Sequence, residues 1–419
     1  EKEGSDCWFT DDPQRFLGKK YKKEDYIKSS DIVEVWFDSG ATHTYVLEKR
    51  KDLIWPASMY LEGSDQHRGW FHSSLLESCG TRGRAPFKSI LTHGFVVDGK
   101  GLKMSKSTGN IIAPEEILKK YGADILRAWV AASDYSEDLR LDHSILEQHA
   151  ESYRKIRNTF RFILGNLRDQ KINFNLNSKE IEKWPELERL MLHQIFVLNK
   201  NFEKYFKEYN FHKLYKELLN FCSLDLSAFY FDIRKDTLYC DDVKSFKRKA
   251  CINLLGLILD ILLKWFAPIL SFTTEEIFQI LNREKNTSIH LEAFPEVPSK
   301  WENAKLFQKW NKLKKIRDVA NAAIEVKRSN KDIGSSLEAE VQISLSKEYL
   351  ELVKDVDLPE YFIASKVEAK TTINDDKLFQ LDEVDNVKIL VKKATGNKCS
   401  RCWKILQNPC ERNNCGLKN

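Results

Sequence analysis

The apolar residues of this 419-residue chain change their spacing near residue 143, and this change limits what the chain can fold into. Beyond that point they recur at three- and four-residue steps, through 143–167, 187–232 and 246–282. Stripes of this kind are typical of amphipathic helices that pack on one another. We therefore predict a helical bundle over residues 143–330.

Residues 1–142 carry a different pattern. Short apolar runs such as Ser58–Gly63 and Ser89–Val97 have the length of strands, and each precedes a helix-like segment. This alternation predicts an α/β layer with parallel strands. Residues 331–396 alternate apolar and charged residues around short turns, which predicts a small α/β unit. Residues 397–419 hold the last cysteines and form a fourth segment.

Composition excludes some classes of protein. The most apolar stretch, Cys251–Leu270, contains Asn253, Asp260 and Lys264, so it predicts a buried bundle helix and no membrane span. The 67 Lys and Arg residues against 62 Asp and Glu leave room for a basic, nucleic-acid-binding face. Nine cysteines, four of them in the last 21 residues, indicate reduced thiols of a cytoplasmic protein with one metal cluster.

Two tracts carry candidate chemistry, Glu62-Gly-Ser-Asp-Gln-His-Arg-Gly-Trp70 and Lys103-Met-Ser-Lys-Ser107. The first ends an apparent strand, where open α/β sheets hold their ligands. We expect Glu62 to be a buried acceptor of substrate hydrogen bonds, and Gly63 to allow a close approach of the backbone. In the second tract, Lys103 and Lys106 are spaced to reach phosphates together. An isolated Lys-x-x-Lys would more often be a solvated loop.

The second tract is a signature of class I aminoacyl-tRNA synthetases. Other tracts make the chain resemble the isoleucyl branch, namely Val35-Trp-Phe-Asp-Ser-Gly40, Leu91-Thr-His-Gly-Phe-Val-Val-Asp-Gly-Lys-Gly101 and Cys399-Ser-Arg-Cys-Trp403. The His-x-Gly-His tetrapeptide, the other signature of the class, does not occur in the sequence. We therefore expect the C-terminal part of a longer enzyme, with half of a Rossmann-type domain and no editing domain.

The resemblance implies a site and a set of substrates. The substrates would be L-isoleucine, ATP with Mg²⁺, and tRNA(Ile), and the intact enzyme would be a monomer that forms an isoleucyl-adenylate. Lys103 and Lys106 would act on the phosphates, and Trp36 and Trp70 would wall the amino-acid pocket. The residues expected at the adenylate and ATP are Glu62, Gly63, Asp65, Gln66, His93 and Lys106.

The last segment offers four thiols for one structural Zn²⁺, from Cys399, Cys402, Cys410 and Cys415. The first pair has the spacing and the Arg-Trp context of the family. The second pair is separated by four residues where the family usually has two, so Cys415 is the less certain ligand. The remaining thiols are expected to be isolated and structural: Cys7, Cys79, Cys222, Cys240 and Cys251.

Two other functions compete with this interpretation. A valyl or leucyl enzyme would share the lysine tract, but the Trp-Phe-Asp-Ser-Gly and Glu-Gly-Ser-Asp-Gln-His-Arg-Gly-Trp tracts resemble the isoleucyl branch much more closely. A non-catalytic tRNA-binding module could also arise from a truncated synthetase. The bundle and the Lys312–Lys315 region have the composition of an RNA surface. We expect this chain alone to bind tRNA without activating isoleucine.

Overall fold

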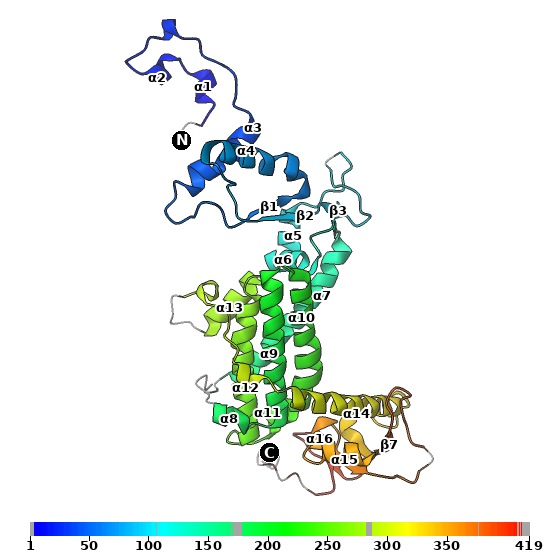
Figure 1. Ribbon diagram of the computed structural model, residues 1–419. Helices are drawn as coiled ribbons and strands as arrows, with labels where there is room; N and C mark the ends of the chain where they lie inside the picture. Colours follow the sequence, from blue (N-terminus) through cyan, green and yellow to red (C-terminus); the bar gives the residue numbers. More distant parts are fainter. Residues whose placement is uncertain are drawn as a thin grey trace. The chain divides into compact units, whose positions relative to one another are not determined.

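The computed structural model describes residues 4–105, 107–168, 170, 178–281, 287–375, 377–408, 410 and 412. The chain, drawn in Figure 1, divides into two compact units. The first unit runs to Met104 and includes Tyr135–Arg140. The second unit comprises Ser105–Asp134 and the chain from Leu141 onward.

The first unit contains short elements around a pair of parallel strands. Strands β1 and β2 pair in parallel from Tyr60↔Ile90 to Gly63↔His93, with α4 between them in sequence. The prediction of parallel strands with an intervening helix is thus confirmed for this pair. The elements are α1 (Cys7–Thr10), α2 (Gln14–Leu17), η1 (Lys23–Asp25), α3 (Val35–Gly40), η2 (His43–Leu47), β1 (Tyr60–Gly63), η3 (Ser64–Arg68), α4 (Trp70–Arg82), β2 (Ile90–His93), and β3 (Val96–Asp98), which pairs with β4 (Leu139–Leu141).

The second unit is mostly helical. Its helix α5 begins at Pro114 and is followed by Gly122, as the sequence predicts, because proline suits the first helical turn and glycine the end. Helices α7, α9, α10 and α12 run side by side in Figure 1. The helices up to the end of the bundle are α5 (Pro114–Tyr121), α6 (Ala123–Ala132), α7 (His143–Leu167), α8 (Ser178–Glu182), α9 (Glu186–Lys207), α10 (Phe211–Asn220), η4 (Phe221–Phe231), α11 (Asp232–Cys240), α12 (Phe246–Phe266), α13 (Ser271–Leu281), η5 (Ile289–Leu291) and η6 (Ser299–Trp301).

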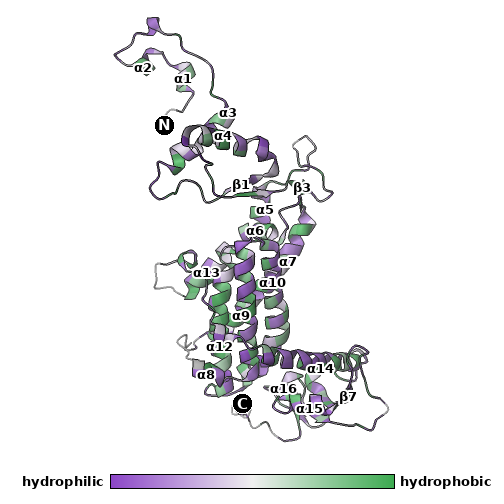
Figure 2. Cartoon of the chain, in the orientation of Figure 1, coloured by the Kyte–Doolittle hydropathy of each residue, from purple (hydrophilic) through white to green (hydrophobic). Residues whose placement is uncertain are grey.

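The core of the bundle lies along α12. Figure 2 shows hydrophobic residues along this helix, and Trp265 and Phe266 are fully buried. The apolar stretch Cys251–Leu270 is therefore a bundle helix, as predicted. Among the residues that the structure describes, no helix has the length and apolar character needed to cross a membrane.

Helix α14 (Ala304–Ser329) packs against both α9 and the sheet that follows. That sheet has the order β6-β5-β7, with β5 (Ala339–Leu345) parallel to β6 (Lys366–Lys370) and antiparallel to β7 (Val387–Lys393). The prediction of a small α/β unit after the bundle agrees with this arrangement. The remaining elements are η7 (Ser336–Glu338), α15 (Lys347–Val353), α16 (Leu358–Tyr361), and a hairpin of β8 (Asn397–Lys398) and β9 (Ile405–Leu406).

Candidate functional site

Three of the predicted adenylate residues gather where β1 and β2 end. Gly63 and His93 are partners in the strand register. A Cβ atom at Gly63 would lie 2.7 Å from Asp65 Oδ1 and 3.9 Å from His93 Cε1. The absence of a side chain at Gly63 therefore lets Asp65 fold back over the strand end. Ligands of open α/β sheets bind at the carboxyl ends of the parallel strands, so this arrangement suits a nucleotide site.

Gln66 lies in η3, just before the start of α4. Its Oε1 accepts a hydrogen bond from the backbone N–H of Trp70 at 2.9 Å, and its Nε2 donates to Asp65 Oδ2 at 3.4 Å. The Gln66 side chain thus accepts from one of the N–H groups that are free at the start of α4, and it is hydrogen-bonded to Asp65, the other predicted polar ligand. Gly69 is buried, and a Cβ there would lie 2.4 Å from Gln66 Oε1 and 3.2 Å from Trp36 Cη2.

Trp70 is held on one face and at its ring nitrogen. Its ring stacks on Tyr60 with the centroids 4.2 Å apart, and its Nε1 donates to Ser39 O at 3.0 Å. Trp36 lies at the start of α3, whose first N–H groups are capped by Glu34, and its side chain is 44% exposed. Both tryptophans therefore border the region of Gly69, which suits the walls of an apolar pocket.

Glu62 differs from the expectation. The sequence predicts a buried carboxylate, but the residue is exposed, and its Oε1 accepts only from the backbone N–H of Gly63 among the described groups, at 3.1 Å. Glu62 is the last but one residue of β1, a strand of four residues that pairs with β2 in the described chain. The expectation of burial is wrong for this unit.

The turn before the lysine tract is tightly bonded. Asp98 Oδ1 accepts from the backbone N–H groups of Lys100 at 3.0 Å and Leu102 at 2.8 Å, and Gly101 has a φ of 83°. Lys103 follows as an exposed residue that bridges to Val97. Lys106, the strongest predicted ATP contact, lies outside the described residues.

Gly94 follows His93 where the backbone has no room for a side chain. A Cβ at Gly94 would lie 2.3 Å from the carbonyl oxygen of Glu137. The neighbouring Phe95 N–H donates to Asp138 Oδ1 at 2.8 Å. This close approach holds His93, whose Nδ1 lies 2.8 Å from Gly94 O, at the strand end.

Three of the four predicted metal ligands come together. The sulfur atoms of Cys399, Cys402 and Cys410 all lie within 4.8 Å of one another. Tetrahedral thiolates around zinc, with bonds near 2.3 Å, are separated by about 3.8 Å, so the three thiols fit three corners of such a site. The backbone N–H of Cys399 donates to Lys404 O at 2.9 Å, which closes the knuckle. Cys415 lies outside the described residues.

The segment around these thiols, residues 397–412, is called the cysteine module below. It is anchored to α11, because Arg412 Nη1 lies 2.7 Å from Asp236 Oδ2 and Arg401 Nη2 donates to Tyr239 O at 2.9 Å. Cys240 was expected to be isolated, but it lines the same cavity of about 620 Å³ as Cys402. Burial, followed by the charge of Asp236, raises the pKa of Cys240 to about 11.

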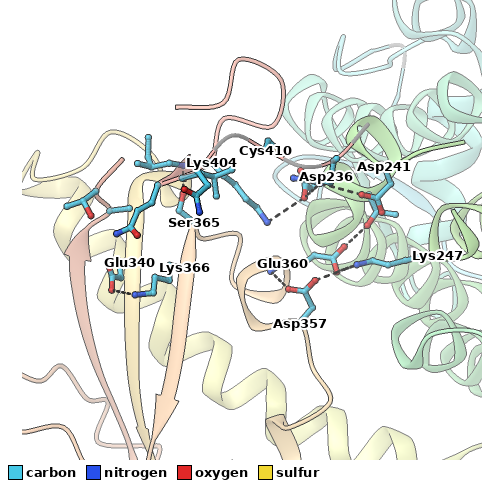
Figure 3. Close-up of a pocket in the computed structure, with 18 residues that line it drawn as sticks. Asp236, Asp241, Lys247, Glu340, Asp357, Glu360, Ser365, Lys366, Lys404 and Cys410 are labelled. Carbon is cyan, nitrogen blue, oxygen red and sulfur yellow. Dashed lines mark hydrogen bonds and ion pairs between the residues drawn. The ribbon is translucent and has the colours of Figure 1, made fainter. Parts of the chain in front are cut away.

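A second cavity of about 560 Å³ lies between the cysteine module, α11 and the sheet (Figure 3). Its walls are charged, and Figure 3 shows that the charges point toward one another. Lys404 lies 3.6 Å from Asp236, and Lys366 lies 3.1 Å from Glu340. These cations are paired with acidic residues of the protein. The cavity is therefore a polar interface between the cysteine module, α11 and the sheet.

Beside that cavity lies a buried ionic network that the sequence analysis missed. Arg234 donates to both carboxylate oxygens of Glu188, at 2.7 and 2.8 Å, and to Glu360 Oε2 at 2.9 Å. Lys247 Nζ lies 2.5 Å from the same Glu360 oxygen. Arg234, Glu188 and Glu360 are 5%, 0% and 6% exposed. The network joins the bundle core to α16, and the only sequence signal for it was a charged residue within an apolar stripe.

The expected RNA surface on α14 is less cationic than its composition indicates. Lys312 lies 2.6 Å from Glu348 and Lys314 lies 3.6 Å from Asp225. Lys305 and Lys315 are exposed, and neither pairs with an acidic residue in the described part of the chain. These two lysines are therefore the better candidates for phosphate contacts on this helix.

Comparisons with known proteins show what the chain is similar to. Residues 1–142 match the family model "tRNA synthetases class I (I, L, M and V)", and residues 188–343 match "Anticodon-binding domain of tRNA ligase". The chain is 65% identical over 412 residues to an isoleucine–tRNA ligase of Pelagibacter ubique, covering 98% of this chain and 44% of that protein. An isoleucine–tRNA ligase of Mesorhizobium japonicum is 46% identical over 96% of this chain and 41% of its own length.

The chain thus spans less than half the length of the curated relatives that it matches, as expected for part of a longer enzyme. A solved complex of Agrobacterium radiobacter K84 agnB2 LeuRS with tRNA and LeuAMS has the same fold, with a TM-score of 0.53 over 87% of this chain and 42% of that chain at 16% identity. One family accounts for the fold and for the sequence identities over almost the whole chain. The chain belongs to the class I tRNA synthetases, in the isoleucine–tRNA ligase family.

Proposed function

We propose that this chain forms part of an isoleucine–tRNA ligase, which attaches L-isoleucine to tRNA(Ile) through an isoleucyl-adenylate. The observation that carries the proposal is the 65% identity to a protein of that name over 98% of the chain. The substrates are isoleucine, tRNA(Ile) and ATP with Mg²⁺. The sequence-based expectation of a cytoplasmic monomer is part of the same proposal.

The first unit supplies the adenylate side of the proposed site. Gly63, Asp65, Gln66 and His93 meet at the carboxyl ends of β1 and β2, where Gly63 lets the protein backbone approach a ligand closely and the polar groups suit a ribose. Glu62 is exposed beside them and can accept hydrogen bonds from the amino acid or its adenylate. Trp36 and Trp70 provide flat apolar surfaces for the isoleucine side chain.

Lys103 and Lys106 supply positive charge to the phosphates in this proposal. In adenylate formation the carboxylate of isoleucine attacks the α-phosphate of ATP, and pyrophosphate leaves. Negative charge grows on the leaving group, so a positioned cation stabilises the transition state more than the bound substrates. The Asp98 turn fixes the start of this tract.

Changing Lys106 to alanine is expected to slow isoleucine-dependent pyrophosphate exchange by about a hundredfold, or roughly 3 kcal/mol, with little change in the KM for isoleucine. The test uses a chimera in which this chain replaces its matching segment of the Pelagibacter ubique relative. Lys119→Ala, an exposed lysine on α5, is the matched control and should exchange at the unaltered rate. An unchanged rate in Lys106→Ala would remove that lysine from the catalytic site.

Cys399, Cys402 and Cys410, with Cys415 as the fourth ligand, would hold one Zn²⁺. A zinc ion with four thiolates has no open position for a substrate, so its contribution is structural. The zinc ion would order the cysteine module, and three basic side chains of the module then hold it in place. Arg401, Lys404 and Arg412 attach it to α11 next to the bundle.

The chain alone is expected to bind tRNA with an affinity that falls as salt increases, because Lys and Arg contacts with phosphates release counterions. Filter binding of the 419-residue chain to a tRNA(Ile) transcript between 50 and 200 mM salt would measure this, with an expected loss of about tenfold or more. The same preparation should show no isoleucine-dependent pyrophosphate exchange. Absence of binding at 50 mM salt would contradict the proposed tRNA partner, and measurable exchange would contradict the role of this chain as one part of the site.

A further inference from the structure

A cavity of about 360 Å³ opens on the bundle between α9, α10 with η4, and α14. All the residues that line it lie between His193 and Lys314, within the segment that matches the anticodon-binding model. It is less charged than the cavity at the cysteine module, because four of its eight polar side chains are uncharged amides. Its volume lies in the range of sites that hold small planar ligands.

Asp225 is the central acceptor in this cavity. Its carboxylate is 30% exposed, it accepts a hydrogen bond from Gln194 Nε2 at 3.1 Å, and it lies 3.6 Å from Lys314 Nζ. An ionised carboxylate has about four acceptor positions, so two contacts leave unused acceptor capacity on a residue that lines the cavity. Burial raises the pKa of Asp225, while Lys314 and Gln194 oppose that shift.

The side chains around Asp225 offer further polar and apolar surface to a ligand. Gln194 Oε1 is buried and has no hydrogen-bond partner in the described part of the chain. Asn311 is an exposed amide on the wall, and Phe307 provides an apolar ring surface beside it. Lys314 is itself fixed, because its Nζ lies 4.6 Å from the centre of the Phe229 ring.

An acidic acceptor, neighbouring amides and an aromatic surface form the combination that proteins use for an unpaired base. Such bases stack on aromatic side chains and form hydrogen bonds through their Watson–Crick edges. A carboxylate selects edges that donate N–H groups. Guanine has two adjacent donors, at N1 and N2, and so can engage both oxygens of one carboxylate, whereas the other bases offer one donor group.

We propose that Asp225, positioned by Gln194 and Lys314, is a specificity-determining residue that reads one unpaired guanine of the tRNA anticodon loop. This assignment rests on the proposed tRNA-binding function and names the group that discriminates the base. Lys314 orients the carboxylate, and Phe307 and Asn311 line the space that the base enters.

The test compares base selectivity in the full 419-residue chain. Each unpaired guanine in the loop of a tRNA(Ile) transcript is replaced in turn by adenine, and dissociation constants are measured at one salt concentration. For one position, the unaltered protein should lose about tenfold to a hundredfold in affinity. Asp225→Asn, which exchanges an acceptor oxygen for a donor, should bind the two transcripts about equally. Asp260→Asn is the matched control, since Asp260 also pairs with a bundle lysine, at 3.0 Å, but lies outside the cavity.

A second measurement needs no change to the protein. Inosine lacks the N2 amino group of guanine, so placing it at the sensitive position should weaken binding by the unaltered chain several-fold and leave Asp225→Asn unaffected. Equal selectivity of the unaltered chain and Asp225→Asn at every loop position would overturn the assignment while leaving tRNA binding intact. Failure of the unaltered chain to bind any tRNA would instead overturn the proposed function together with this inference.

Discussion

Replacing Arg234 by methionine is expected to lower the free energy of unfolding of the second unit by about 3–5 kcal/mol. The change removes a buried cation and leaves Glu188, which is fully buried, with only the neutral donors Tyr230 and Cys251. An uncompensated buried carboxylate is costly because water cannot reach it. Urea unfolding followed by far-UV circular dichroism would measure the loss.

Lys235→Met is the matched control for this prediction. Lys235 is the next residue of α11, its side chain is 53% exposed, and its pair with Asp232 should contribute little. The double variant Arg234→Met with Glu188→Leu should recover much of the loss, because Glu360 keeps Lys247 and Thr237 as partners. A loss below about 1 kcal/mol in Arg234→Met would show that the network does not hold the bundle together.

The network also fixes the direction of the pH dependence. Burial alone would raise the pKa of Glu360, but Arg234 and Lys247 hold it below its ordinary value of 4.5. A carboxylate with a lowered pKa stabilises the folded protein above its ordinary pKa, and this contribution disappears as the pH falls through the folded-state pKa. The urea midpoint of the unaltered chain should therefore fall as the pH drops below 4.5, and fall less steeply in Arg234→Met.

Cys402→Ser should release the proposed zinc ion and loosen the cysteine module. Structural zinc sites contribute about 10–16 kcal/mol of binding free energy in small zinc peptides, so losing one thiolate of four should lower occupancy by orders of magnitude. Metal analysis of the purified chain would measure the zinc, and hydrogen exchange at Ile405, whose N–H donates to Ser365 Oγ at 2.6 Å, would report the loosening.

Cys79→Ser provides the control, since Cys79 is an exposed free thiol on α4 and should not affect the metal. Full zinc occupancy in Cys402→Ser would disprove the cluster. Full occupancy after Cys415→Ser would remove only the fourth ligand. In the chimera, pyrophosphate exchange should persist in Cys402→Ser while tRNA charging decreases, because the metal acts on the module that adjoins the bundle.

The sequence predicted the elements whose apolar spacing is regular. Helix α12 was predicted from an apolar run that contains too many polar residues to cross a membrane. The start of α5 was predicted from Pro114. The parallel pairing of β1 with β2 followed from strand-length runs on either side of a helix. These predictions succeeded because local periodicity and local capping decide such elements.

The site was less accessible to sequence analysis, since it depends on contacts between distant residues. Glu188, Arg234 and Glu360 are far apart along the chain, and a charged residue within an apolar stripe does not reveal its partners. The pairing of Lys312 with Glu348 could not be inferred from a basic run either. Side-chain burial and ion pairing are set by tertiary packing, which periodicity does not describe.

The segment η4 has a consequence for how this part of the chain tolerates insertions and deletions. It runs without a break from α10 into α11 as a π-helix, in which each turn holds more residues than in an α-helix. Removing one residue from it would turn α11 by about 100° relative to α10. Arg234 would then face away from Glu188, and a removal between Phe221 and Asp225 would also turn Asp225 out of its cavity. The length of residues 221–231 is therefore constrained by folding and, in its first half, by the proposed base recognition.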